Sequence, residues 1–506
     1  MSSTAVSLGK WIVVSQHLPK EKLHGLQTAG FFEIGNLDAL GDSYSGTISF
    51  DGGLFKHGQA RDFSAQYSNA DNQQYKIQVL GPSQTSRAYA TALTSQGGSL
   101  ELQGGNLVLD GTNTYTGETK IYGGSLTVNG SLSNSTAVSV ANGATYELGA
   151  NDEVGSIEGA GKINLGSSTL TSGGNNANKT FSGTISGTGG LTKSGTGKLS
   201  LTGAKSFTGD TTINAGTLES EGSAMSSAVA VASGATYEID LVAAADSATY
   251  SKSISGAGSF LKSGAGALTF DQVHSYTGST AISGGELKIS SSGSFSDSTV
   301  VDVSSGSTYQ LGNLDTIAGL KGAGSVDLNG NELTVNQSAS QVTFSGALSG
   351  SATGSNLRKQ GLGNFILSGS SNTYSGGTFI DAGTLSISGK PNNNSGIDID
   401  SGAVLGFDIS GSQAYTGVIS GAGDLRKSSS GSLQLSGLNT YKGATIISGG
   451  ALSVASSGSL SDSTIIDLSS GASYQLGDNE TIAGLKGAGS VDLNKKALTI
   501  NTSLRY

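Results

Sequence analysis

The sequence predicts an all-β chain folded as a parallel β-helix, a solenoid whose coils stack on one another. Three observations carry this prediction. Short stretches alternate apolar and polar residues, as in "LQLSG" from Leu433 and "ALSV" from Ala451, which is the period of a strand. Clusters of Gly, Asn, Asp and Ser separate these stretches. The pattern returns at a fixed spacing, and no long segment has a helical period.

The repeat has a long period. The segment "SDSTVVDVSSGSTYQLGNLDTIAGLKGAGSVDL" begins at Ser296 and returns with changes at Ser461, 165 residues later and without a gap. A more diverged copy begins at Ser133. One coil cannot bury its own inward row of Leu, Ile and Val, but stacked coils bury a continuous apolar column. At roughly 20 residues per coil, residues 98–506 would form about 20 coils.

The chain is expected to contain two regions. Residues 1–97 form a small N-terminal β-rich region of uncertain fold, and residues 98–506 form the β-helix, whose last unit of about 165 residues is truncated. The N-terminal region differs in composition because it holds the one Trp, three of the four His and two of the three Pro: Trp11, His17, His24, His57, Pro19 and Pro82.

Comparison of the internal copies separates expected core positions from expected corners. Apolar residues replace apolar residues at the positions interpreted as core, where Val300, Val301 and Val303 become Ile465, Ile466 and Leu468. Other positions drift freely and are interpreted as solvent-facing corners, where Asn313-Leu314-Asp315 becomes Asp478-Asn479-Glu480 and Gly330-Asn331-Glu332 becomes Lys495-Lys496-Ala497. Each module also carries an aromatic residue two positions before a glycine, such as Tyr115 or Tyr441, which is expected where one strand turns into the next.

Composition narrows the expected partners and compartment. The net charge is −10, and because an acidic surface repels phosphate backbones, nucleic acid is not an expected partner. Cysteine is absent, which fits either chance or a chain that crosses an oxidising periplasm unfolded. The N-terminus lacks the basic start and apolar run of a signal peptide, and no apolar run is long enough to span a membrane as a helix.

The search for chemistry predicts no catalytic, cofactor-binding or metal-binding residues. The four His are isolated from one another, and His274 stands at a corner of the repeat where other copies carry Thr, Ser or Asn, so we expect it in a loop. The stretch "LTKSGTGKLS" has the look of a phosphate loop. However, Thr192 replaces the first glycine, and Leu199 follows Lys198 where Ser or Thr is needed, so we interpret it as a structural turn.

Two further residue pairs are candidates, one for calcium binding and one for exposure at the surface. Asp398 and Asp400 share a strand face, but the repeat of the calcium-binding roll is absent, and solvated carboxylates are favoured over a calcium site. Tyr122 and Phe379 occupy outward positions beside Ile121 and Ile380; packing beneath a loop is favoured over exposure.

Enzymatic activity is not expected, and neither is a cofactor. Arg occurs five times and the acids are spread thinly, so the clustered carboxylates of a carbohydrate-active β-helix are missing from the sequence pattern. No Gly-x-Ser-x-Gly motif stands near a plausible His partner for nucleophilic catalysis.

The segment "FSGTISGTGGLTKSGTGKLSLTGAKSFTGDTTINAGTLES", from Phe181 to Ser220, resembles the autotransporter-associated β-strand repeat, also called the passenger-associated transport repeat. The pattern recurs five times and covers roughly residues 98–503. The resemblance implies a right-handed β-helical passenger domain of type V secretion in Gram-negative bacteria. It further implies an extracellular or surface-exposed stalk in adhesion or autoaggregation. The partners would be other copies of itself or host receptors, protein or glycan, with the outer membrane reached only through a β-barrel that this chain does not contain.

The N-terminal "SLGKWIVVSQHLPKEKLHGLQ" is similar to a segment of filamentous-haemagglutinin-like adhesins, which implies an internal piece of a larger exoprotein. Two alternatives to adhesion stay open. One is a spacer or secretion-driving scaffold, and the other is a β-helical carbohydrate-active enzyme. The sequence does not separate the spacer from the adhesin.

Overall fold

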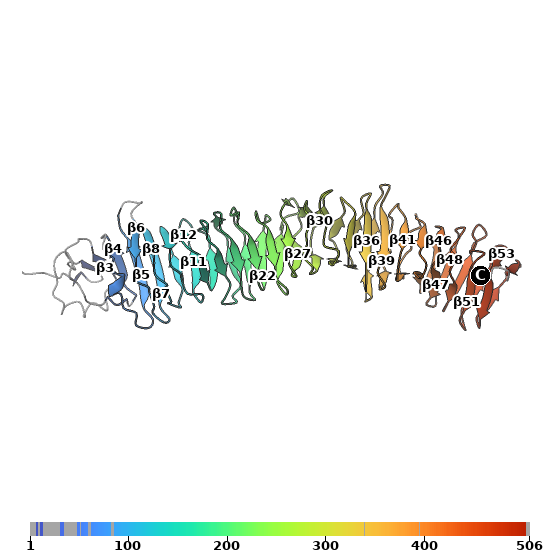
Figure 1. The fold of residues 1–506 in the computed structure, drawn as a ribbon, viewed down its shortest axis with the longest axis horizontal. Coiled ribbons are helices and arrows are strands. Elements are labelled where there is room, and N and C mark those ends of the chain that lie inside the picture. The colour runs from blue at the N-terminus through green and yellow to red at the C-terminus, as the bar shows by residue number, and fades with distance from the viewer. Residues whose placement is uncertain are drawn as a thin grey trace, which may run out of the picture. The chain divides into compact units, whose positions relative to one another are not determined.

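A computed structural model describes residues 7–8, 11–13, 31–34, 48–50, 52–58, 62–81, 86–338, 340–393 and 395–501. They form strands and turns, with one short 3-10 helix, η2 (Ser64–Gln66). In this part of the chain no helix is long and apolar enough to cross a membrane. The chain forms two compact units, unit 1 (Met1–Ile239) and unit 2 (Asp240–Tyr506). Each unit is a parallel β-solenoid, with about 22 turns in all, which confirms the predicted all-β solenoid (Figure 1).

Unit 1 winds through three parallel sheets, so that a complete coil has three faces. The long sheet of unit 1 contains β2 (Trp11–Val13), β3 (Phe31–Ile34), β4 (Leu54–His57), β5 (Gln74–Val79), β7 (Ser99–Gly104), β9 (Thr119–Ile121), β11 (Ala137–Val140), β14 (Ser156–Gly159), β17 (Lys179–Phe181), β20 (Lys198–Leu201), β22 (Thr217–Glu221) and β24 (Thr236–Asp240), with β1 (Ser7–Leu8) antiparallel to β2. The second sheet contains β6 (Ser86–Tyr89), β8 (Asn106–Leu109), β10 (Ser125–Val128), β12 (Thr145–Leu148), β15 (Lys162–Asn164) and β18 (Thr184–Ser186). The third contains β13 (Asp152–Val154), β16 (Leu170–Ser172), β19 (Leu191–Lys193), β21 (Thr211–Ile213) and β23 (Val229–Val231).

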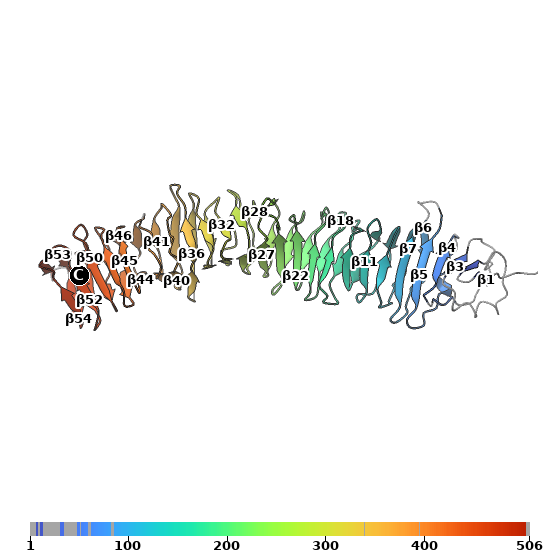
Figure 2. The same ribbon diagram turned by 180° about the vertical axis from the view of Figure 1, so that it is seen from behind.

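Unit 2 repeats this arrangement, and its strands succeed one another in chain order in both views (Figures 1 and 2). Its long sheet contains β27 (Ser259–Ser263), β29 (Thr280–Ile282), β31 (Val300–Val303), β34 (Gly319–Gly322), β37 (Val342–Phe344), β40 (Asn364–Leu367), β42 (Thr384–Ile387), β44 (Val404–Asp408), β47 (Asp424–Ser428), β49 (Thr445–Ile447), β51 (Ile465–Leu468) and β54 (Gly484–Gly487). A second sheet contains β25 (Ser247–Tyr250), β28 (Ala267–Phe270), β30 (Glu286–Ile289), β32 (Thr308–Gln310), β35 (Ser325–Asp327) and β38 (Ala347–Ser349).

The remaining strands of unit 2 complete its coils. A third sheet contains β33 (Asp315–Ile317), β36 (Glu332–Asn336), β39 (Asn356–Gln360), β41 (Thr378–Ile380), β43 (Ile397–Ile399) and β46 (Ile419–Gly421). Later coils use β45 (Ser412–Tyr415), β48 (Ser432–Leu435), β50 (Ala451–Val454), β52 (Ser473–Gln475) and β55 (Ser490–Asp492), with a two-stranded sheet of β53 (Glu480–Ile482) and β56 (Leu498–Ile500). β26 (Ile254–Ser255) is a further short strand of this unit.

The register places like residues above like residues. Leu126 of β10 pairs with Leu107 of β8 and with Tyr146 of β12, and all three side chains are fully buried. Their neighbours along each strand point outward, because successive strand residues face opposite sides. The same alternation buries Leu433 and Leu435 in β48, as the sequence predicts. Each coil therefore adds a layer to a continuous apolar core.

One predicted core position is wrong. Val301 and Val303 of β31 are fully buried, but Val300 faces outward in the same strand. Its counterpart Ile465 is 45% exposed. Three apolar residues within four positions cannot all face inward in a strand, because the side chains alternate.

The predicted packing of the aromatic residues at the turns is confirmed. Tyr115, Tyr276, Tyr374 and Tyr441 lie between strands and are at most 2% exposed. Each hydroxyl is hydrogen-bonded to the threonine four residues later, for example at 2.6 Å between Tyr115 Oη and Thr119 Oγ1. The hydroxyl is thus satisfied within the core, as buried polar groups require.

Glycines allow the closest approach of one coil to the next. Gly124 has a φ of 74°, and a Cβ atom at this position would lie 1.8 Å from the carbonyl oxygen of Gly105 in the preceding coil. Within the part of the chain that the structure describes, the long sheet of each unit has a step at which only one pair of residues is aligned between neighbouring strands. These pairs are Gly159 with Phe181 between β14 and β17, and Gly322 with Phe344 between β34 and β37.

The N-terminal part of the chain shares the parallel ladder. β5 pairs with β4 on one side and with β7 on the other, so the pairing runs through residue 97. The boundary between residues 97 and 98 stays a prediction. Most of the segment similar to filamentous-haemagglutinin-like adhesins, residues 7–27, lies outside the described residues, as do His17, His24 and Pro19.

Candidate functional site

The residues considered individually in the sequence are not brought together into one site. Instead, the described residues contain polar clusters that the sequence analysis did not find. They comprise buried lysines, buried acids, a polar residue beside each turn aromatic, and a lysine shared by two glutamates.

Four lysines project into the core at the same place of the repeat, and each is at most 1% exposed: Lys193, Lys262, Lys359 and Lys427. Each ammonium donates hydrogen bonds to three backbone carbonyls. Lys359 Nζ, for instance, lies 2.6 Å from the oxygens of Gln360 and Gly361 and 3.2 Å from that of Ala382 in the next coil. Burial lowers the pKa of Lys193, Lys262 and Lys359 to about 8.

These lysines explain the loop that resembles a phosphate site. Around Lys193, the carbonyls of Ser194, Gly195 and Ala215 converge on an ammonium. A phosphate site requires converging N–H groups instead. The structure therefore agrees with a structural turn. In the first repeat Leu102 occupies the lysine position, since it pairs with Ile121 as Lys193 pairs with Ile213.

Three acids are buried at matching positions, each at the start of a strand: Asp152, Asp315 and Glu480. This corrects the expectation that Asp315 and Glu480 lie on solvent-facing corners, since they are 2% and 4% exposed. Each carboxylate accepts a hydrogen bond from a backbone N–H of the preceding coil: Leu132 at 2.9 Å, Phe295 at 3.2 Å and Leu460 at 2.7 Å. The acids face inward because they satisfy these otherwise unpaired donors.

Burial raises the pKa of all three acids, that of Asp315 to about 6 and that of Glu480 to about 7. The tyrosines of the neighbouring strands differ in whether they donate a hydrogen bond to the acid. Tyr146 donates its hydroxyl to Asp152, and Tyr309 donates to Asp315 at 2.5 Å. The hydroxyl of Tyr474, near Glu480, has no hydrogen-bond partner among the described residues.

Phe207 is a fifth turn aromatic and is 1% exposed. A buried polar residue stands two positions before each of the five: Asn113, Lys205, His274, Asn372 and Asn439. Asn439 shows the arrangement most clearly. Its Oδ1 accepts from Ile419 N–H at 2.9 Å, and its Nδ2 donates to the carbonyls of Gly437 and Ser459 at 2.9 and 2.7 Å. The residue thereby ties its own coil to the coils before and after.

His274 lies in a loop, as expected, but it is 1% exposed, and its counterparts are three Asn and one Lys. Its Nδ1 accepts a hydrogen bond from Ile254 N–H at 3.1 Å. Burial lowers the pKa of His274 to about 4, so the ring stays neutral and is unsuited to general acid catalysis near neutral pH.

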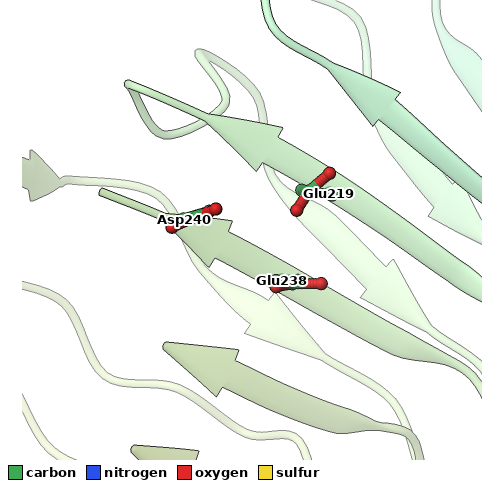
Figure 3. Close-up of side chains that lie close together, drawn as sticks. All are labelled: Glu219, Glu238 and Asp240. Atoms are coloured by element: carbon green, nitrogen blue, oxygen red, sulfur yellow. The ribbon is translucent and has the colours of Figure 1, made fainter. Parts of the chain in front are cut away.

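Figure 3 shows acidic side chains of β22 and β24. Glu219 projects from β22 and Glu238 from β24, and both side chains are about nine-tenths buried although they belong to the outer side of their strands. Lys198 Nζ lies 2.6 Å from Glu219 Oε1 and 3.0 Å from Glu238 Oε2. Ser200 also donates to Glu219. Burial opposes the charge of Lys198, but the two glutamates outweigh it and raise its pKa.

A carbohydrate-active β-helix would require paired carboxylates, and Glu219 and Glu238 are two carboxylates that lie close together. No local signal in the sequence indicates this proximity, because Glu219 and Glu238 belong to different coils. Both are nevertheless covered and bound to one ammonium, which leaves neither free to protonate or attack a sugar. Together with Asp240, two residues further along β24, they are the group of acids that could hold a metal ion among the residues described. Lys198 already supplies positive charge to the two glutamates.

Among the residues considered for exposure or calcium, Phe379 pairs with Asp398 between β41 and β43, and Tyr122 lies in unit 1. Tyr122 is 49% exposed, so the favoured packing beneath a loop is wrong for this residue. The half-buried ring of Phe379 is covered by Arg358, whose guanidinium carbon lies 4.7 Å from the ring centroid. Asp398 accepts a hydrogen bond from Ser420 at 2.6 Å, and Asp400 is exposed beyond the end of β43.

Comparison with known proteins gives two matches. The Passenger-associated-transport-repeat family matches residues 103–128, 191–219, 260–289, 357–387 and 425–454. In the last four segments the third residue is the buried lysine. The chain is also 32% identical over 330 residues to "Adhesin BmaC autotransporter" of Brucella suis biovar 1 (strain 1330). This match covers 57% of the chain and 9% of that adhesin, so the chain spans a small part of the relative. No solved structure matches the chain.

Proposed function

Because the chain is an autotransporter passenger domain with passenger-associated transport repeats, we propose that it is a β-helical stalk that serves adhesion or autoaggregation at the bacterial surface. The observation that carries the proposal is the similarity to an autotransporter adhesin over more than half of the chain. The partners would be other copies of the chain or surface receptors, protein or glycan. Either partner requires a passenger that is secreted or exposed on the cell surface.

The structure supports a mechanical role for the stack of coils, which is to hold its outer faces in place. Each coil buries its apolar residues against the coils on both sides, and the polar clusters at the turns bond across the same steps. A stack of this kind keeps its outer faces in a fixed arrangement. Those faces carry Ser, Thr, Gln and charged residues, which offer many weak hydrogen-bonding positions rather than one deep site.

Two other functions make different predictions. A spacer would hold some other part of a longer protein away from the cell and would bind nothing itself. A carbohydrate-active enzyme would require free carboxylates, whereas Glu219 and Glu238 share the ammonium of Lys198. The kinship with adhesin passengers also favours a non-enzymatic role.

The purified chain, coupled to microscopic beads, tests adhesion without any need for secretion. We expect coated beads to cluster with one another or to bind host cells and extracellular matrix more than beads coated with an unrelated β-solenoid. Beads that neither cluster nor bind would contradict the adhesive function.

A deletion of residues 296–460 tests where along the chain the binding surface lies. It joins Phe295 directly to Ser461 and keeps the register, because Ser296 and Ser461 begin equivalent copies. If this segment carries the binding surface, the shortened chain loses binding although circular dichroism shows the same strand content per residue. Unchanged bead binding after the deletion would place adhesion elsewhere in the chain.

A further inference from the structure

Within the described residues, three buried acids have no cationic partner, and they occupy matching positions of the long repeat. Asp152, Asp315 and Glu480 each bond to a backbone N–H of the preceding coil, at 2.7 to 3.2 Å. Lysines and arginines elsewhere pair with other acids, such as Lys321 with Asp302 and Arg358 with Glu332. The buried lysines donate to carbonyls.

The groups that face the three acids are neutral or negative. Tyr146 and Tyr115 lie near Asp152, and the carboxylate of Glu153 acts on it from the outer side of the same strand. Asp315 faces Tyr309, Tyr276 and the carboxylate of Asp297. Glu480 faces Tyr474, Tyr441, Asp462 and Asp478. Burial and the neighbouring carboxylates disfavour the ionised form. Hydrogen bonds from backbone N–H groups and, at Asp152 and Asp315, from the tyrosine hydroxyl favour it, but burial has the larger effect.

We propose that Asp152, Asp315 and Glu480 stabilise the stack of coils when they are protonated. As the medium becomes mildly acidic, each buried carboxylate binds a proton from solvent. Its coil then holds more tightly to the preceding one. The carbonyl oxygen of the neutral acid continues to accept the backbone N–H bond. At Asp152 and Asp315 a tyrosine hydroxyl donates a hydrogen bond to the ionised carboxylate. The hydroxyl of the neutral acid forms a hydrogen bond with the same tyrosine hydroxyl. Protonation therefore removes a buried charge without breaking the connection between coils.

The sign of the effect follows from linkage. The pKa of each acid in the folded chain lies above that of the free side chain, so the folded chain binds protons that the unfolded chain does not. Stability is lowest above the folded pKa and rises as the pH falls through it toward the free value. With its pKa near 6, Asp315 alone changes the folding equilibrium constant about tenfold between about pH 7.5 and 5.

The test compares the full chain with the double variant Asp152→Asn/Asp315→Asn. Asparagine reproduces the neutral acid, since its Oδ1 accepts the N–H bond and its Nδ2 reaches the tyrosine hydroxyl. We expect the variant to be more stable than the unaltered chain toward urea at about pH 7.5. By about pH 5 this advantage of the variant should be smaller. Protonation of Asp315 alone should reduce the ratio of the two folding equilibrium constants, variant over unaltered chain, by about tenfold or more. His274 titrates in the opposite sense in both proteins, so it cancels from this difference.

Asp210→Asn is the matched control, since Asp210 is exposed, and it measures what replacing a surface carboxylate does to stability. A stability difference that is independent of pH would overturn the proposal. Should the double variant not fold, carbon-13 spectra of the unaltered chain labelled at aspartate decide the matter. An aspartate carboxyl group that titrates near pH 6 supports the proposal. Titration of every aspartate carboxyl group below about pH 5 overturns it.

Discussion

His274 accepts a hydrogen bond from the backbone N–H of Ile254 at 3.1 Å, but its Nε2 has no hydrogen-bond partner among the described residues. A neutral ring that accepts through Nδ1 carries its proton on Nε2, so a buried donor is left unpaired. The asparagines at the equivalent position avoid this, because Asn113 and Asn439 each donate to two carbonyls.

We therefore predict that His274→Asn stabilises the chain by about 1–3 kcal/mol, the cost of an unsatisfied buried donor. Urea unfolding followed by circular dichroism measures the change. The reverse substitution Asn439→His should destabilise by a similar amount. A destabilising effect of His274→Asn would mean that packing of the ring against Phe270, whose centroid lies 4.0 Å away, outweighs the unpaired nitrogen.

The same histidine gives a prediction for pH. Its pKa of about 4 in the folded chain lies below the value near 6.5 of a free histidine, so the unfolded chain binds the extra proton. The contribution of His274 to stability is therefore present above about pH 6.5 and is lost as the pH falls toward about 4. The advantage of His274→Asn over the unaltered chain should widen over this range, and urea titrations at a series of pH values would show whether it does.

A third prediction concerns the buried lysines. Lys359→Met leaves the three carbonyls around Nζ without their donor and should destabilise unit 2 by about 1–3 kcal/mol. Lys321→Met is the control, since Lys321 pairs with Asp302 at a half-exposed site and should change stability by less than about 1 kcal/mol. Equal effects of the two substitutions in thermal or urea unfolding would contradict the role of the carbonyl bonds.

The glycine turns offer a matched pair in unit 1. Gly124 and Gly143 both have positive φ, 74° and 84°, so alanine at either position costs about 1–2 kcal/mol of backbone strain. Only at Gly124 does the added Cβ meet a neighbouring carbonyl, whereas the space around Gly143 is open. Gly124→Ala should therefore cost at least about 1–3 kcal/mol more than Gly143→Ala. Similar unfolding midpoints for the two variants would show that the coils can separate at little cost.

The shared lysine of the glutamate pair gives a further prediction. Lys198→Met leaves the buried carboxylates of Glu219 and Glu238 without their ammonium and should destabilise unit 1 by about 1–3 kcal/mol. Lys120→Met removes the exposed pair with Glu118 and should cost less than about 1 kcal/mol. Adding Glu219→Gln/Glu238→Gln to Lys198→Met should restore most of the loss, and its failure to do so would assign the effect to packing.

The strands were predictable because their signal is local and repeated. The inward positions of Leu433 and Leu435 follow from alternation alone. The buried acids were not predictable in this way. Asp315 becomes Glu480 and is flanked by residues that vary freely, which is the pattern of an exposed corner. Its burial depends on the N–H of Phe295 in another coil, a contact that the local sequence does not encode.

The polar clusters between coils share this property. Lys193 and Lys427 belong to the repeat pattern, but nothing in their neighbours along the chain indicates that the ammonium points inward to carbonyls. The pair of Glu219 and Glu238 depends on which residues the register aligns in successive coils. The sequence therefore predicts the strands and their stacking, but not which polar side chains form hydrogen bonds or ion pairs between coils.

The two narrow steps of the long sheets have a mechanical consequence. Between β14 and β17 the sheet holds through Gly159 and Phe181, and between β34 and β37 through Gly322 and Phe344. The hydrogen bonds of a parallel ladder point from coil to coil, so tension along the stack loads them directly. Under such a pull each unit should begin to tear at its narrow step and yield in segments rather than all at once.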